Sequence, residues 1–254
     1  MMKLLMTIAF FLLSITHLMA TPLKVGVTAG PHAMIMEKVK ELAKAEGIEI
    51  QVIEFNDFIL PNAALNDKEL DINVYQHQPF LDEQVKSRGY KIKSAGKTVL
   101  MPLGIYSHTL TKLADLKDKS KIAIPSDPTN EGRALKLLEK EGLIKLAPSE
   151  NPSILDIVNN PKKLTILEIE APQLPRILDD VDAAVINTDW VLLAGLNPLT
   201  ALASEDKRSP YANVIAIRED ESRPEVKQII QLYQSEPIKM FIQEKFKGAI
   251  LPAW

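Results

Sequence analysis

The order of apolar and polar positions predicts strands and helices in turn from residue 23 onward. Short apolar or alternating runs, which are typical of strands, occur at 23–27, 48–55 and 72–75. Helices are predicted at 32–46, where apolar residues recur every three or four positions, and in shorter form at 62–68 and 80–87. This alternation favours an α/β fold with a largely parallel sheet.

The same alternation begins again after residue 120. Strands are predicted at 121–124, 164–169, 183–186 and 214–218, and helices at 129–140, 172–178, 223–234 and 237–246. The β-rich stretch 98–107 contains a proline and is predicted to cross between two units. Because no low-complexity linker is present, we expect ordinary strands to join the two units. These crossings are expected near 104–108 and 213–219. The predicted lobes are 21–106 plus 217–254, and 107–216.

Residues 1–20 have the layout of a secretory signal peptide, with Lys3, an apolar run and the small residue Ala20 before the expected cleavage site. A membrane-spanning helix needs about 20 apolar residues, and Ser14, Thr16 and His17 interrupt this run. An uncleaved anchor is the alternative.

Composition narrows the class of protein further. A net charge of −3 argues against nucleic acid as a partner, since that requires a strongly basic surface. The chain contains no cysteine, which excludes thiol catalysis, thiolate metal sites and lipid attachment through an N-terminal cysteine. A chain of this length can bury a sufficient core without disulfides.

Polar and aromatic residues gather where predicted strands end, in the segments 28–32, 75–80, 125–133 and 187–190. Ligands of α/β sheets bind at the carboxyl ends of strands, so these segments are expected to meet at one crevice. The second of them, YQHQPF, places Tyr75, His77 and Phe80 together in a chain with only 6% aromatic residues.

Arg133 is the most informative charge, because it lies in the first turn of the helix predicted at 129–140. Helix N-termini favour anions, so a guanidinium there indicates a carboxylate site. The alternative is a surface ion pair with Glu131 or another acid.

The other candidates suit a ligand with an apolar part and a polar part. Tyr75, His77 and Phe80 can line an apolar pocket with a polar edge, or form a core cluster with a hydrogen-bonded histidine. Asn187 and Asn213 can bind an ammonium or carboxylate group through their amides, or cap local turns.

Metal binding and catalysis receive little support. His32, His77 and His108 do not have zinc-ligand spacing, and none of the patterns GxSxG, HExxH and GxxxxGK[ST] occurs. A zinc or manganese site and a secreted hydrolase stay as minor alternatives. We expect a binding protein that is not an enzyme and has no cofactor.

Five segments taken together resemble the NlpA/MetQ family of methionine-binding proteins of ABC importers. They are VGVTAGPHAMIME, FNDFILPNAALNDKELDINVYQHQPFLD, IAIPSDPTNEGRALKLLEKEGLIKL, AVINTDW and SPYANVIAIRED. The resemblance implies a two-lobed periplasmic-binding-protein fold of type II-like topology, with the ligand cleft between the lobes. It also implies delivery of methionine to a membrane permease and its ATPase, and a monomeric protein.

The same resemblance implies roles for individual residues. Arg133 would bind the ligand carboxylate, and Asn187 and Asn213 would hold the polar end of the amino acid. The thioether side chain would be surrounded by Phe58, Tyr75, His77 and Phe80.

The sequence departs from the family pattern in two places. Thr21 stands where members carry a lipidated cysteine, so we expect a free periplasmic protein or one held by an uncleaved signal. The family tends to have tyrosine at the positions of Phe58 and Phe80 and phenylalanine at Tyr75. Hydroxyl groups that contact a ligand affect specificity strongly, so another amino acid or a methionine-containing dipeptide is the alternative ligand.

Overall fold

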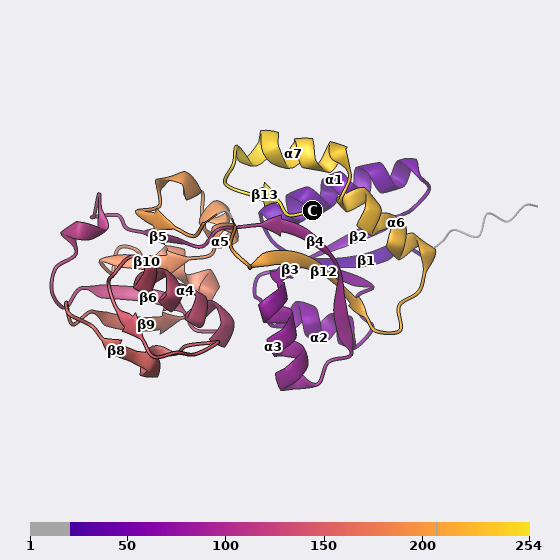
Figure 1. The fold of residues 1–254 in the computed structure, drawn as a ribbon. Helices are drawn as coiled ribbons and strands as arrows, with labels where there is room; N and C mark the ends of the chain where they lie inside the picture. Colours follow the sequence, from indigo (N-terminus) through magenta and orange to yellow (C-terminus); the bar gives the residue numbers. More distant parts are fainter. Residues whose placement is uncertain (1–20, 207) are drawn as a thin grey trace, which may run out of the picture.

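The computed structural model describes residues 21–206 and 208–254, which form two α/β lobes side by side (Figure 1). The predicted signal peptide, residues 1–20, lies outside the described residues. Within the described residues, no helix is both long enough and apolar enough to span a membrane.

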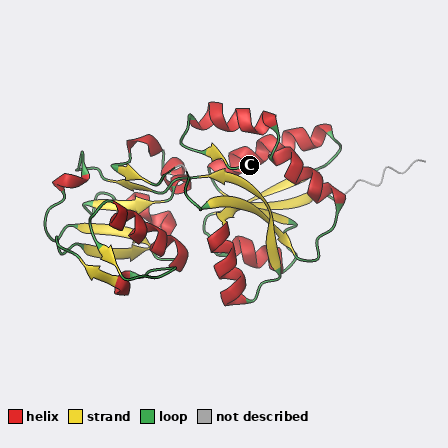
Figure 2. Ribbon diagram, in the orientation of Figure 1, coloured by secondary structure: helices red, strands yellow, loops and turns green. Residues whose placement is uncertain are grey.

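We call the first lobe the six-stranded sheet, in the order β13-β4-β12-β3-β1-β2, together with its helices. Its strands are β1 (Leu23–Thr28), β2 (Ile50–Phe55), β3 (Ile72–His77), β4 (Ile92–Leu100), β12 (Ala212–Arg218) and β13 (Leu251–Pro252). Its helices are α1 (Pro31–Ala45), α2 (Leu60–Asn66), α3 (Gln78–Arg88), α6 (Pro224–Tyr233) and α7 (Glu236–Phe246). The helices cover both faces of the sheet (Figure 2).

The second lobe is the five-stranded sheet, in the order β11-β5-β10-β6-β9, with the elements around it. Its strands are β5 (Gly104–Tyr106), β6 (Lys121–Pro125), β9 (Thr165–Ile169), β10 (Ala183–Ile186) and β11 (Ala203–Ser204), and a separate hairpin pairs β7 (Lys145–Leu146) with β8 (Ile157–Asn159). The α-helices are α4 (Pro128–Lys140) and α5 (Thr188–Leu193), and the 3₁₀ helices are η1 (Leu113–Asp115), η2 (Ile154–Asp156), η3 (Ala171–Ile177) and η4 (Pro198–Thr200).

Hydrophobic periodicity explains where the longer helices lie. In α1 the side chains of Ile35, Met36, Val39 and Ala43 recur at helical spacing and are all buried against the first sheet. The helix predicted at 172–178 is instead the 3₁₀ helix η3. Its prolines lack the amide hydrogen that a regular α-helix requires.

The prediction of a largely parallel sheet is wrong, because both sheets are mixed. In the first sheet β1 is parallel to β2 and β3, whereas β12 is antiparallel to β3 and β4. In the second sheet β10 is parallel to β6 and antiparallel to β5. The physical reason is the connectivity: β4 leaves the first lobe for the second, and β12 returns from it in the opposite direction.

The chain therefore passes between the lobes twice, between β4 and β5 and between β11 and β12 (Figure 1). The first crossing is at 101–103, a little before the predicted 104–108, because 104–106 already pairs in the second sheet. The second crossing likewise ends before the predicted 213–219, because 212–218 already pairs in the first sheet. The predicted domain limits, 21–106 plus 217–254 and 107–216, stay a prediction.

Candidate functional site

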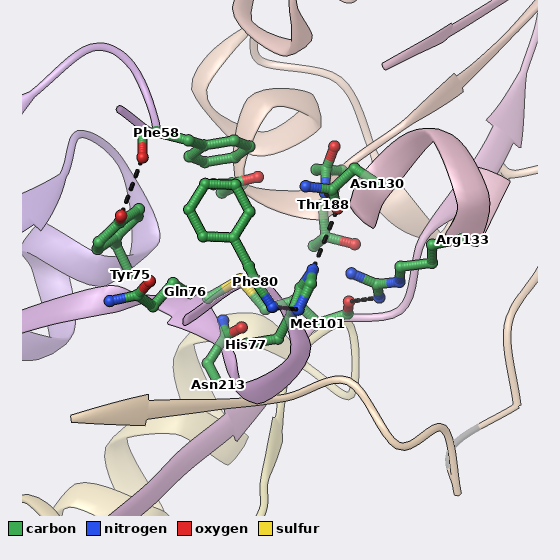
Figure 3. Close-up of a pocket in the computed structure, with 12 residues that line it drawn as sticks. Phe58, Tyr75, Gln76, His77, Phe80, Met101, Asn130, Arg133, Thr188 and Asn213 are labelled. Carbon is green, nitrogen blue, oxygen red and sulfur yellow. Dashed lines mark hydrogen bonds between the residues drawn. The ribbon is translucent and has the colours of Figure 1, made fainter. Parts of the chain in front are cut away.

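A pocket lies between the two lobes, and the space in it that the centre of a water-sized sphere can occupy is about 30 Å³ (Figure 3). All seven residues proposed from the sequence line it. The full lining is Phe58, Tyr75, Gln76, His77, Phe80, Met101, Asn130, Arg133, Asn187, Thr188, Asp189 and Asn213. Three of the four segments that the sequence predicted to converge, 75–80, 125–133 and 187–190, therefore contribute to the pocket, whereas 28–32 does not line it.

Aromatic rings form one wall of the pocket. The ring centroids of Phe58, Tyr75 and Phe80 are 6.1 Å from one another, and Trp190 of α5 packs against Phe58 at 5.2 Å. The Tyr75 hydroxyl donates to the Phe58 backbone oxygen at 2.9 Å. This hydrogen bond occupies the hydroxyl proton with the protein, so the wall is largely apolar toward the pocket.

His77 shows why β3 ends where it does. It is the N-cap of α3, and its Nδ1 accepts a hydrogen bond from the Phe80 amide at 3.1 Å. The other ring nitrogen, Nε2, must then carry the proton that it donates to Asn130 Oδ1 at 3.3 Å. Burial, helped by the charge of Arg133, lowers the pKa of His77 to about 3, so the ring is neutral.

Asn130 links the two lobes through its side-chain amide. Its Nδ2 donates to both carboxylate oxygens of Asp127, the N-cap of α4, at 3.1 and 3.0 Å. Its Oδ1 consequently faces the pocket and accepts from His77 and from Asn187 Nδ2, the latter at 2.9 Å. Burial raises the pKa of Asp127, although the hydrogen bonds from Asn130 and its neighbours act in the opposite direction.

Arg133 is placed differently from the sequence prediction. Because α4 begins at Pro128, Arg133 is in the second turn of the helix rather than the first. Its guanidinium forms a two-bond pair with Glu205, from Nε at 2.7 Å and from Nη2 at 2.5 Å, and Nη2 also donates to Met101 O at 2.9 Å. The Tyr211 ring lies 4.5 Å below the guanidinium carbon.

The ion pair considered as an alternative thus exists, but its partner is Glu205 and it is buried. Glu131 instead accepts a hydrogen bond from the Ile154 amide. The remaining guanidinium nitrogen of Arg133, Nη1, has no hydrogen bond to any residue in the described part of the chain. Figure 3 shows this end of the side chain pointing toward His77. The edge of the guanidinium that carries Nε and Nη2 is therefore held by the protein, and Nη1 is available to a ligand.

Asn213 is the second residue of β12 and lies directly beside the end of β3, since its register partner is His77. Its Nδ2 lies 3.2 Å from Nε2 of His32, on α1. Burial lowers the pKa of His32 to about 3, so this histidine is also neutral. Asn213 therefore lines the pocket beside an uncharged histidine.

Five lining residues were missed by sequence reasoning: Gln76, Met101, Asn130, Thr188 and Asp189. Gln76 and Thr188 are direct sequence neighbours of predicted residues, so extending the predicted strand ends by one position finds them. Asp189 lies in the predicted segment 187–190, but sequence reasoning gave it no role of its own. Met101 carries no chemical signal in the sequence, because its contribution depends on where the crossing segment lies.

Metal ligation has no support in this geometry. Among residues 21–206 and 208–254, no group of three or more histidine or acidic side chains is arranged to hold an ion. His77 is committed to the Phe80 amide and Asn130, and Nδ1 of His108 pairs with Asp179 at 2.7 Å.

Two α/β lobes, two crossing segments and a pocket between the lobes are the features of periplasmic substrate-binding proteins. An ABC transporter periplasmic substrate-binding protein from Coxiella burnetii superposes with a TM-score of 0.88 at 46% identity, covering 91% of this chain and 100% of that one. The chain belongs to the NlpA lipoprotein family, whose model matches residues 23–254.

Two further relatives carry ligand information of their own. The D-methionine-binding lipoprotein MetQ of Salmonella typhi is 46% identical over 239 residues, which is 91% of this chain and 88% of that protein. A nutrient-binding protein from Burkholderia cenocepacia, solved bound to methionine, has a TM-score of 0.89 at 50% identity, covering 91% of this chain and 100% of that one. Because the family and the Salmonella typhi protein are named lipoproteins, the expectation of a non-lipidated protein finds no support here.

Proposed function

We propose that this protein is an extracytoplasmic binding protein that captures methionine in the interlobe pocket and delivers it to the permease and ATPase of an ABC importer. The observation that carries the proposal is the composition of that pocket. One wall is aromatic, one guanidinium nitrogen of Arg133 makes no hydrogen bond to the described residues, and most of the remaining lining residues carry amides. A free amino acid with an unbranched apolar side chain matches these three features.

The carboxylate of the ligand is assigned to Arg133. Its Nη1 is directed into the pocket while Nε and Nη2 are held by Glu205 and Met101 O. A hydrogen bond between a guanidinium and a carboxylate is charge-assisted, and stronger than one between neutral groups. Asn187 and Asn213 are assigned to the polar end of the ligand, which their amide groups can bind as donors or acceptors.

The thioether side chain is assigned to Phe58, Tyr75, His77 and Phe80. Sulfur contacts with aromatic rings contribute about 0.3–1.5 kcal/mol each. Because the Tyr75 hydroxyl is bonded to the Phe58 backbone oxygen, it does not demand a polar partner from the ligand. This supports methionine over a polar amino acid.

We expect the lobes to close over the ligand, because the lining residues come from both lobes. The aromatic wall and Asn213 belong to the first lobe, whereas Asn130, Arg133 and Asn187 belong to the second. A ligand that contacts both sets favours the closed arrangement, as in other hinged binding proteins. The closed form is the one that the permease would recognise. The proposal includes no bond-making step and no cofactor.

The proposed place of action is the periplasm, reached through the signal peptide predicted at residues 1–20. We further propose that the protein works as a monomer, which light scattering of the purified protein checks directly.

The decisive experiment is calorimetric titration of protein that has been unfolded in denaturant, stripped of ligand and refolded. Methionine is compared with other amino acids and with methionine-containing dipeptides, and both enantiomers of methionine are included. Arg133→Ala is expected to weaken methionine binding by about 1.5–3 kcal/mol, or roughly 10- to 150-fold. Arg88→Ala, which removes an exposed arginine outside the pocket, is the matched control and should leave the affinity unchanged.

Two results would contradict the proposal. Wild-type affinity in Arg133→Ala would remove the carboxylate role, and absence of methionine binding in the wild type would remove methionine as the ligand. Tight binding of a different amino acid or of a dipeptide would keep the binding-protein function and move the specificity to the aromatic wall.

A further inference from the structure

The ligand pocket has two larger neighbouring cavities, each bordered by residues of both lobes. We call them the α3 cavity, between α3, Lys136 of α4 and Tyr211, and the α5 cavity, between Asn56, η3 and Trp190 of α5. The centre of a water-sized sphere can occupy about 270 Å³ in the α3 cavity and about 230 Å³ in the α5 cavity, against about 30 Å³ in the pocket. A ligand on its way to the pocket therefore has room in either cavity.

Tyr211 stands between the α3 cavity and the pocket. It lines the cavity and not the pocket, but its ring contacts two residues that line the pocket. Its centroid is 5.1 Å from that of the His77 ring, in an edge-to-face arrangement, and 4.5 Å from the guanidinium carbon of Arg133. Because His77 belongs to the first lobe and Arg133 to the second, the Tyr211 ring bridges the lobes at this boundary.

Tyr211 is held by few contacts. It is partly buried and belongs to none of the four hydrophobic clusters of the described residues. Its amide donates to Ser209 Oγ at 3.4 Å, and its hydroxyl makes no hydrogen bond to the described residues. Trp190, which stands between the α5 cavity and Phe58, is 3% exposed and packs in a core cluster of the second lobe. Residues with few buried apolar contacts move at lower cost, so the Tyr211 side is the easier one to open.

We propose that Tyr211 is the gate of the ligand pocket, and that amino-acid ligands enter and leave past its ring by way of the α3 cavity. This inference rests on the proposed function. Because Tyr211 does not line the pocket, its ring obstructs the route without holding the ligand at its end. Such a group raises the barriers to entry and exit by the same amount, so it slows both rates and leaves Kd unchanged.

The competing explanation is that Tyr211 only orients Arg133 through its ring. Removing the ring would then weaken binding of the ligand carboxylate, and changes of affinity within one site are mostly changes of the release rate. Release would become faster, Kd would rise by the same factor, and the association rate would stay the same. The association rate, which is the release rate divided by Kd, therefore distinguishes a gate from a positioning residue.

The experiment loads the protein with radiolabelled methionine, dilutes it into excess unlabelled methionine and follows the loss of label, with Kd from calorimetry. Tyr211→Ala removes the contacts with His77 and Arg133, which should speed release about five- to fiftyfold. The association rate should rise by a similar factor, so that Kd changes little. Tyr211→Phe keeps the ring and should keep release slow.

A matched pair of substitutions tests the route itself. Asn151→Trp introduces a large side chain at an exposed position of the α3 cavity, and should slow release and association by the same factor. Gln173→Trp introduces the same side chain at an exposed position of the α5 cavity, and should leave both rates as in the wild type.

Wild-type release from Tyr211→Ala overturns the inference, as does faster release with an equal rise in Kd. If Tyr211→Ala fails to fold, the tryptophan pair decides the question: no change in Asn151→Trp, or equal slowing in both variants, also overturns it. A failure of the proposed function is a different result, because the wild-type protein would then retain no labelled methionine at all.

Discussion

Replacement of Glu205 tests the electrostatic design of the pocket most directly. Its side chain is 10% exposed and that of its partner Arg133 is 3% exposed, so both charges are buried. Removing one member of a buried ion pair costs about 3–5 kcal/mol, because the other charge stays buried without compensation. We expect that loss of unfolding free energy for Glu205→Ala in the ligand-free protein.

Glu205→Gln should lose less than the alanine variant. A glutamine oxygen can still accept a hydrogen bond from Arg133 or from the Leu103 amide, which Glu205 Oε2 binds at 2.9 Å. In either variant the ligand carboxylate at Nη1 supplies part of the missing negative charge. The loss should therefore be smaller at saturating methionine, where ligand adds stability according to its concentration and Kd.

Urea unfolding followed by circular dichroism, with and without methionine, measures these differences. Asp206→Asn is the matched control, since Asp206 is the neighbouring acid and its pair with Arg208 is exposed. It should show no measurable change, as is usual for surface pairs. A Glu205→Ala protein within about 0.5 kcal/mol of wild type, the range of ordinary surface substitutions, would refute the reasoning.

Three other substitutions test separate parts of the site by urea unfolding. Tyr75→Phe removes the hydrogen bond to Phe58 O and should cost about 1 kcal/mol with no loss of methionine affinity; a large affinity loss would contradict this. Asn62→Ala leaves Gln76 Oε1 without its donor and should cost about 1–3 kcal/mol; an unchanged midpoint would contradict this. Asp189→Asn should remove the contribution by which Asp189 lowers the unfolding free energy as pH rises from 3.8 to about 7, so that the difference between the two proteins changes by at most about 1.4 kcal/mol per pH unit.

The sign of the pH effect follows from proton binding. The folded state holds the Asp189 proton up to about pH 7, because burial raises its pKa, whereas the unfolded chain releases it near 3.8, so the stabilising contribution of Asp189 is lost as pH rises through that interval. His32 and His77 act in the opposite direction, because their pKa values are lowered from 6.5 to about 3 in the folded state and the unfolded chain therefore binds their protons first as pH falls. The contribution of Asp189 is consequently the difference between the wild-type and Asp189→Asn profiles. Parallel pH profiles for wild type and Asp189→Asn would show that Asp189 does not titrate there.

Much of the secondary structure is readable from local pattern. The helix predicted at 32–46 is found at Pro31–Ala45, and the strand predicted at 183–186 is found at the same residues. These elements are predictable because a period of 3.6 or 2 records directly which side chains face a core. Strand direction is not recorded in that way. The antiparallel entry of β12 beside β3 depends on a crossing that no local periodicity encodes.

Those residues of the candidate site that come directly after predicted strands could be predicted from the sequence. Tyr75, His77 and Asn187 were found because strand ends converge, and the family resemblance added Phe58. The Arg133–Glu205 pair was not found, because its members are 72 positions apart and only the fold brings them together. Asp189 was overlooked for a different reason: an acid at the start of a helix has an ordinary local explanation, and its lack of a cationic partner is visible only in three dimensions.

Arg133 also connects the pocket to both crossing segments. Met101 O belongs to the first crossing, while Glu205 and Tyr211 flank the second, and all three contact the guanidinium. Fixing an arginine side chain costs about 2 kcal/mol of rotamer entropy, and the protein has already met that cost before a ligand arrives. A ligand carboxylate at Nη1 therefore meets a preorganised partner. Glu205 reduces the net positive charge near Nη1, so it weakens the electrostatic attraction of the ligand carboxylate while it fixes the orientation of the guanidinium.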